Sequence, residues 1–93
     1  MYICNAFSLQ MVKEFPCTID FEEVKELPHG LESAIGHADT ARVLGFPCNR
    51  INVSLEKGDS VYIAQLVGGR LPEGATALPE GFAFKYLKAT VRD

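Results

Sequence analysis

Alternating apolar and polar positions dominate the C-terminal half of the chain and predict strands there. Residues 50–55 place three aliphatic side chains on one face and two polar ones on the other, which is typical of a strand with one solvated face. Residues 60–67 (SVYIAQLV) have the pattern of a buried strand, and residues 82–91 (FAFKYLKATV) alternate again. Residues 56–59 (EKGD) are typical of a four-residue hairpin turn. We therefore expect at least one antiparallel hairpin.

The N-terminal half carries shorter strand signals separated by turns. Residues 2–8 open with apolar, β-prone side chains and predict a first strand, and residues 18–21 alternate as a second short strand. At most one helical turn is expected within residues 9–14, because a proline follows soon after them. Residues 22–27 are charged and helix-prone but short, and residues 31–36 are ambiguous.

One main helix is predicted at residues 39–44. His37 or Asp39 lies where the N-cap belongs, and Gly45 lies where a helix-ending glycine belongs, with a proline two residues later. Because strands outnumber helices, we expect an α+β fold, in which a small mixed or antiparallel β-sheet has one main helix packed on it.

Size and composition limit the class of protein. The 93 residues, of 10.2 kDa, suffice for one domain over residues 1–93, and oligomerisation would help its marginal core. No apolar run approaches the ~20 residues of a membrane span, and the N-terminus has no signal-peptide pattern. We therefore expect a cytoplasmic protein without a membrane partner. A formal net charge of −3 argues against a general DNA or RNA binder.

The cysteines do not predict a metal site. Cys4, Cys17 and Cys48 are widely spaced without a CxxC pair, and the chain has only two histidines. We expect reduced cytosolic thiols that serve as small core residues, with no metal and no cofactor. The motifs GxGxxG, HExxH, GxSxG and the P-loop are absent from the sequence.

His37 is the most informative candidate for chemistry. Gly36 before it allows a ligand to approach the backbone, and the predicted helix after it offers free N–H groups and the Thr40 hydroxyl. A histidine at such a point can contact a phosphate ester and give or take a proton. The alternative is a histidine that only caps or packs against the helix.

Arginines at strand ends form the next candidate group. Arg50 begins a predicted strand and Arg70 follows a Gly-Gly break, so that their guanidinium groups could hold a phosphate, as could that of Arg42. Glu73, in the loop predicted at residues 71–81, could orient Arg70 or a hydroxyl. The alternatives are surface arginines paired with acidic neighbours and an exposed loop glutamate.

Asn5, Ser8 and Gln10 follow the first predicted strand. Their side chains could hydrogen-bond a base or a sugar. The alternative is that they form turns by bonding to nearby backbone groups.

Four segments, in order, resemble the motifs of the viral ring nucleases, the type III anti-CRISPR proteins of archaeal viruses and phages, with bacterial relatives. They are residues 2–11 (YICNAFSLQM), 33–40 (SAIGHADT), 49–53 (NRINV) and 65–74 (QLVGGRLPEG). Many viral members have a longer segment, with an extra helix, after the last of these motifs. The short segment 74–81 is therefore expected to cover a ligand less completely.

The resemblance implies a homodimer that binds cyclic tetra-adenylate, a symmetric second messenger, across its two-fold axis. It implies metal-independent cleavage to linear di-adenylate with a 2′,3′-cyclic phosphate, which would switch off type III CRISPR signalling. His37 aligns with the catalytic histidine as general acid, and Glu73 with an acidic site residue that acts as a base or only orients. The implied substrate-binding residues are Asn5, Ser8, Gln10, Gly36, Thr40, Arg50, Gln65 and Arg70.

Two other classes of function stay open at this point. The same fold could capture a cyclic oligonucleotide without cutting it, in which case replacing His37 would leave the function intact. The chain could also be a small structural or interaction homodimer that binds no nucleotide. A metal-dependent nuclease would need clustered acidic or histidine ligands, which the sequence does not suggest.

Overall fold

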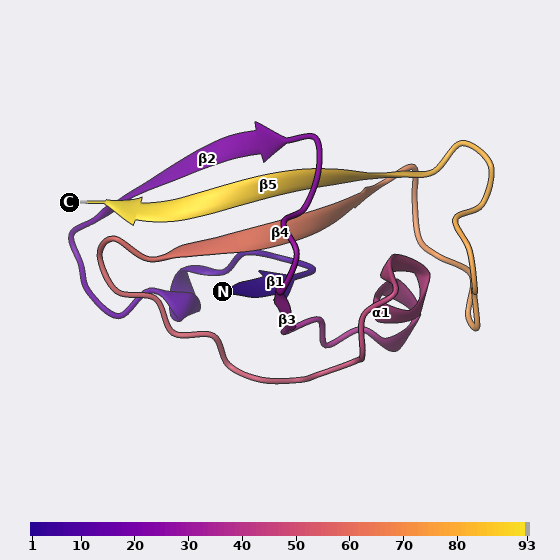
Figure 1. Cartoon of the computed structure of the whole chain (residues 1–93), viewed down its shortest axis with the longest axis horizontal. Coiled ribbons are helices and arrows are strands. Elements are labelled where there is room, and N and C mark those ends of the chain that lie inside the picture. The colour runs from indigo at the N-terminus through magenta and orange to yellow at the C-terminus, as the bar shows by residue number, and fades with distance from the viewer. Residues whose placement is uncertain (93) are drawn as a thin grey trace.

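The computed structural model describes residues 1–92, in which a five-stranded sheet carries one α-helix on one of its faces (Figure 1). The order of the strands across the sheet is β2-β5-β4-β1-β3. The elements are β1 (Tyr2–Cys4), the 3₁₀ helix η1 (Leu9–Met11), β2 (Thr18–Val24), β3 (Glu32–Ser33), α1 (Ala38–Leu44), β4 (Ser60–Val67) and β5 (Ala83–Arg92).

The sheet is mixed, as predicted, and this confirms the α+β class. β5 pairs antiparallel with β4 on one side and with β2 on the other, whereas the short β1 is parallel to both β4 and β3. The antiparallel hairpin of the fold is β4–β5, whose connection runs over residues 68–82.

The prediction for residues 50–55 is wrong, because this segment forms no strand. Only Leu55 makes an isolated parallel bridge, to Val12. Val53 and Leu55 are nevertheless buried in the core. The alternation therefore indicated correctly that these side chains point inward, although the segment has no neighbouring strand to pair with. The turn at residues 56–59 is present, with the Asp59 amide donating to Glu56 O at 2.9 Å, but it leads from this extended segment into β4.

Two other boundaries differ from expectation. The first strand ends at Cys4 instead of continuing to residue 8, because Ser8 caps η1 by accepting a hydrogen bond from the Gln10 amide at 3.2 Å. The helix-prone start of residues 22–27 belongs to β2, which pairs with β5 as far as Val24. Cross-strand pairing outweighs the weak local preference for a helix there. The Glu23 carboxylate oxygen Oε2 lies 3.6 Å from Lys85 Nζ of β5.

Helix α1 agrees with its sequence signals. His37 is its N-cap, and Gly45 follows it with a left-handed φ of 83°, a conformation that suits glycine. The Phe46 amide donates to Ala41 O at 2.9 Å, which satisfies one of the last carbonyl groups of the helix.

Hydrophobic side chains pack on both faces of the sheet. Successive residues of β4 point to opposite faces, so that Val61 and Ile63 join the cluster that contains Cys4, whereas Ala64 joins the cluster under α1. Ile35 in the second cluster is fully buried. This packing fixes α1 against the sheet close to the end of β4.

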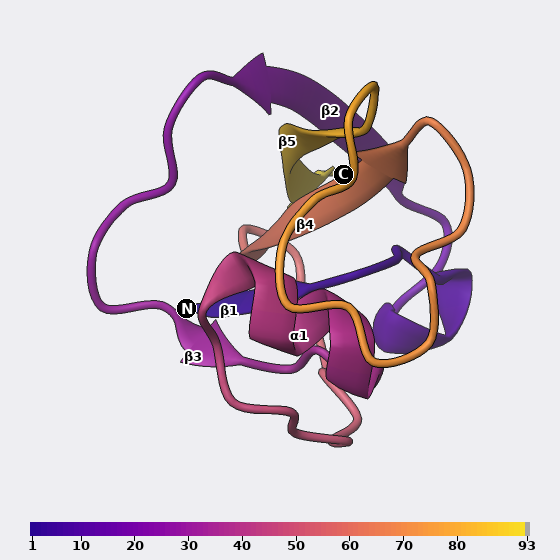
Figure 2. The ribbon, with the colours of Figure 1, turned by 90° about the vertical axis from the view of Figure 1, so that its right-hand side faces the viewer.

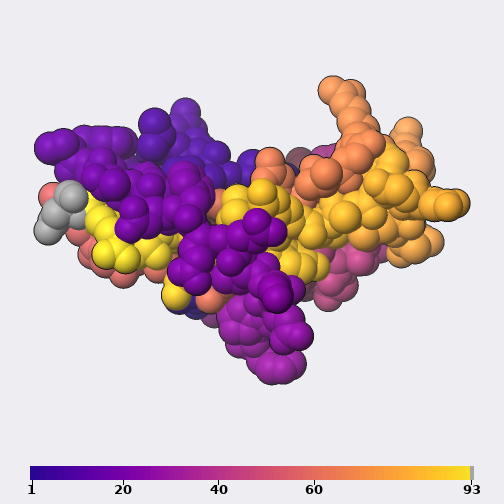
Figure 3. Space-filling model, turned by 90° about the horizontal axis from the view of Figure 1, so that it is seen from above, coloured from indigo at the N-terminus to yellow at the C-terminus, as the bar shows by residue number. Residues whose placement is uncertain are grey.

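The long β4–β5 connection passes over α1 (Figure 2). In the space-filling view it forms the orange and gold end of the molecule (Figure 3). The two ends of this connection come close together at Gly68, which has no side chain. A Cβ at this position would lie 3.0 Å from Gly81 O. Within residues 1–92, no helix has the length and apolar character needed to cross a membrane.

Candidate functional site

A cavity of about 460 Å³ lies between the start of α1, the end of β4 and the connection that follows β4. It brings together four of the predicted site residues from two separate parts of the sequence, residues 37–40 and 70–73. Leu66 is the β4 residue that reaches it. The lining residues are His37, Asp39, Thr40, Leu66, Arg70, Leu71 and Glu73.

His37 has two roles in this geometry. Its Nδ1 accepts a hydrogen bond from the Thr40 amide at 3.4 Å and lies 3.3 Å from Thr40 Oγ1, while the residue as a whole is exposed. A neutral ring that accepts at Nδ1 must carry its proton at Nε2. Within residues 1–92, Nε2 has no hydrogen-bond partner, so it is the nitrogen available to a ligand.

The same contact removes one of the free N–H groups expected after His37. The Thr40 amide, which the sequence analysis offered to an anion, is already satisfied by the His37 ring. Thr40 is itself buried, with its hydroxyl beside that ring. Of the amides expected to be free at the start of α1, that of Thr40 is therefore occupied by the His37 ring.

Arg70 and Glu73 reach the cavity from the β4–β5 connection. Both are exposed, and neither has an ion pair or a hydrogen bond within the described residues 1–92. A turn closed by the Ala75 amide, which donates to Pro72 O at 3.1 Å, sets the backbone at Glu73. Both charged groups are thus available to a ligand.

Arg50 does not begin a strand and does not line this cavity, but it lies next to Gly36. Its Nε donates to Gly36 O at 2.9 Å, and a Cβ on Gly36 would lie 3.2 Å from Arg50 Cγ. Asn49 holds the segment, because its side-chain amide donates to Ser33 O and its backbone amide donates to Ile35 O, both at 2.9 Å. A side chain at Gly36 would therefore crowd the arginine beside His37.

The other predicted binding residues lie in two further cavities. Ser8 and Gln10 line one of about 350 Å³, and Asn5 and Gln65 line one of about 300 Å³ beside Phe7. Gln65 and Leu66 are neighbours on β4 and point to opposite faces of the sheet. In a single copy of the chain, the predicted site residues therefore lie in separate places and not in one cavity.

Sequence reasoning missed the part that Asp39 and Arg42 play at the cavity. Asp39 entered only as a cap and Arg42 only as a phosphate-binding candidate. In the structure Asp39 lines the cavity and both residues contact the β4–β5 connection. An acidic residue followed three positions later by an arginine was the available signal, but that spacing indicates only a pair along a helix.

The thiols are not equivalent. Cys4 is buried and fits the prediction of a small core residue, whereas Cys48 is exposed, contrary to that prediction. Burial raises the pKa of the Cys4 thiol to about 11, a hydrogen bond with the Ala6 backbone lowering it only in part. The Cys4 thiol therefore stays protonated near neutral pH and is no nucleophile there. Within residues 1–92, no three side chains of metal-ligating type lie close enough together to hold an ion.

Comparisons with known proteins place this geometry in a family. No curated protein matches the chain. Among solved structures, B116 of Sulfolobus turreted icosahedral virus (STIV) is similar, with 25% sequence identity and a TM-score of 0.73 over 96% of this chain and 97% of that one. The family described as STIV B116-like matches residues 1–83, which is most of the chain, and the protein therefore belongs to the STIV B116-like family.

Proposed function

We propose that this protein is a viral, metal-independent ring nuclease, which cleaves cyclic tetra-adenylate to linear di-adenylate with a 2′,3′-cyclic phosphate and so switches off type III CRISPR signalling. One observation carries the proposal. A ring nitrogen, a guanidinium group and a carboxylate line one cavity, and within residues 1–92 none of the three has a partner. The four sequence segments that resemble ring nuclease motifs and the similarity to a viral protein also support it.

The reaction needs no nucleophile from the protein. A ribose 2′-oxygen attacks the adjacent phosphorus in line, the bond from phosphorus to the 5′-oxygen breaks, and the 5′-oxygen takes up a proton. The protein must hold the in-line geometry and supply that proton.

His37 is the general acid of this proposal. In the imidazolium form, Nε2–H gives its proton to the departing 5′-oxygen, and the ring keeps the proton on Nδ1. Thr40 Oγ1, 3.3 Å from Nδ1, is in place to accept a hydrogen bond from that N–H. In this form Nδ1–H no longer accepts from the Thr40 amide, so the hydrogen bond to Thr40 Oγ1 replaces the cap of the neutral ring and keeps the ring in place.

Arg70 stabilises the charge that develops on the phosphoryl oxygens, and Arg50 beside Gly36 holds a second phosphate. Glu73 accepts the proton of the 2′-hydroxyl or orients that hydroxyl. The remaining binding residues, on the other cavities, contact the ring in a homodimer whose two-fold axis matches the symmetry of the substrate. Because each chain carries a net charge of −3, the local attraction of the arginines must outweigh a repulsive average field. Salt screens this local attraction, so binding of four phosphates should weaken as salt is added.

The test is a cleavage assay with cyclic tetra-adenylate in EDTA, with the products resolved by chromatography. His37→Ala should abolish formation of linear di-adenylate. His29→Ala, which removes the exposed histidine of a surface turn, is the matched control and should cleave like the wild type. An intact ring that co-elutes with the wild-type protein would overturn cleavage in favour of sequestration. Absence of both binding and cleavage would overturn both and leave the structural homodimer.

A further inference from the structure

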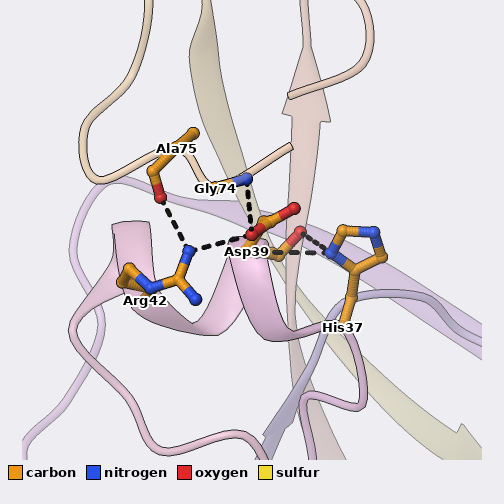
Figure 4. Close-up of polar contacts among 6 residues, drawn as sticks. His37, Asp39, Arg42, Gly74 and Ala75 are labelled. Carbon is orange, nitrogen blue, oxygen red and sulfur yellow. Dashed lines mark hydrogen bonds and ion pairs between the residues drawn. The ribbon is translucent and has the colours of Figure 1, made fainter. Parts of the chain in front are cut away.

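We infer that the ion pair between Asp39 and Arg42 (Figure 4) holds the segment 70–75 on helix α1. It thereby positions Glu73 in the cavity beside His37. Asp39 and Arg42 are positioning residues in this inference, because they act through the backbone of the β4–β5 connection. The catalytic consequence rests on the proposed function, but the structural contact does not depend on it.

Two neighbouring residues of the connection are bound by the pair. Asp39 Oδ1 accepts hydrogen bonds from Arg42 Nη1 at 2.9 Å and from the Gly74 amide at 3.2 Å. The same Nη1 donates to Ala75 O at 3.1 Å. One carboxylate oxygen and one guanidinium nitrogen thus engage both a donor and an acceptor of the backbone, as Figure 4 shows.

The position of these bonds explains why they matter for Glu73. The Gly74 nitrogen belongs to the peptide bond that begins at the Glu73 carbonyl. Fixing the Gly74 amide therefore fixes the peptide plane next to the Glu73 Cα. Within residues 1–92, these are the hydrogen bonds that join segment 70–75 to α1, and the other one within the segment is the local turn from Pro72 to Ala75.

The burial of the pair favours a lasting contact. The side chain of Asp39 is only 19% exposed, and that of Arg42 is 47% exposed. Hydrogen bonds to ionised groups are stronger than neutral ones, and partial burial lowers their screening by salt. A connection as long as residues 68–82, attached only at its base near Gly68, would sample many positions without such a contact.

The inference is tested with Asp39→Ala, Asp39→Asn and Arg42→Met. Arg42→Met keeps the helix-forming aliphatic stem of an exposed residue, so it should fold even if Asp39→Ala does not. Asp20→Ala is the matched control, because it removes a carboxylate that pairs with Arg92 across β2 and β5, away from the cavity. Hydrogen exchange of the ligand-free proteins should accelerate at residues 70–75 in Asp39→Ala and Arg42→Met and stay unchanged in Asp20→Ala.

Kinetics then separate positioning from direct binding. In Asp39→Ala we expect kcat for ring cleavage to fall about tenfold or more, while KM changes by less than about threefold. Asp39→Asn, which keeps an oxygen acceptor for the Gly74 amide, should recover part of the loss. Added to Glu73→Gln, Asp39→Ala should cause no further loss, because both changes disable the same group.

Additive losses in the double variant, a rise in KM alone, or unchanged exchange at residues 70–75 would each overturn the inference. A wild-type protein that leaves the ring intact would instead overturn the nuclease assignment and the kinetic part of the inference. The exchange measurement would still decide whether the pair holds the segment, so the two failures are distinguishable.

Discussion

His37 Nδ1 lies 3.4 Å from the Thr40 amide nitrogen and caps helix α1 with the ring that lines the cavity. The cap uses the neutral ring, whose Nδ1 accepts and whose Nε2 is left for a ligand, whereas the proposed acid is the imidazolium form. Stability and chemistry at this residue should therefore be separable by substitution.

We predict that His37→Asn keeps the stability of the protein and loses its cleavage activity, whereas His37→Ala loses both. Asparagine is a favourable N-cap, and replacing a capping side chain by alanine costs about 1 kcal/mol of stability. Urea unfolding gives the free energies and the chromatographic assay gives the activity. Residual cleavage by His37→Asn would contradict the general-acid role, and wild-type stability in His37→Ala would contradict the role of the cap.

A second prediction concerns the base of the β4–β5 connection. Gly68 and Gly58 both have positive φ, 118° and 93°, but a Cβ at Gly68 would lie 3.0 Å from Gly81 O, whereas one at Gly58 meets no atom within 4 Å. Alanine at Gly58 should cost about 1–2 kcal/mol from backbone strain alone. Alanine at Gly68 should cost at least ~1 kcal/mol more, because backbone atoms cannot move aside cheaply. Equal midpoints of denaturant unfolding would contradict the steric explanation.

The buried thiol of Cys4 predicts a loss of stability at alkaline pH. Its pKa is raised from 9.0 to about 11 in the folded protein, mainly by burial, and the thiol donates a hydrogen bond to Tyr62 O at 3.5 Å. Well below pH 9 the thiol is protonated in both states and the effect is absent. Between about pH 9 and 11 the unfolded chain loses this proton first, so stability should fall by roughly 2–3 kcal/mol.

The measurement compares urea unfolding at pH 7.5 and pH 11 for the wild type and Cys4→Ala. Subtracting the pH dependence of the variant removes the contributions of the lysines and tyrosines. The wild type should lose more stability than Cys4→Ala on going to the higher pH. Identical losses in the two proteins would show that the Cys4 thiol is not held protonated by the fold.

Local signals account for the elements that were predicted well. Helix α1 ends at Gly45 because the backbone there has a positive φ, which glycine tolerates. It begins at His37 because the ring of this residue accepts a hydrogen bond from an amide that has no partner within the helix. The apolar run of β4 predicts a buried strand wherever the strand sits in a sheet. Each of these signals involves contacts or periodicity within a few residues of the chain.

The features that the sequence did not predict depend on strand pairing and contacts between segments that are distant in the chain. Residues 50–55 alternate because Val53 and Leu55 are buried, yet burial does not provide a strand partner. Residues 22–24 join a strand because β5 lies beside them. The amino-acid sequence by itself determined the α+β class, the helix with its caps and the likeness of His37, Arg70 and Glu73 to a known motif. Only the tertiary structure decided that Asp39 meets Gly74, 35 positions away, because such a contact depends on how the sheet brings α1 to the end of β4.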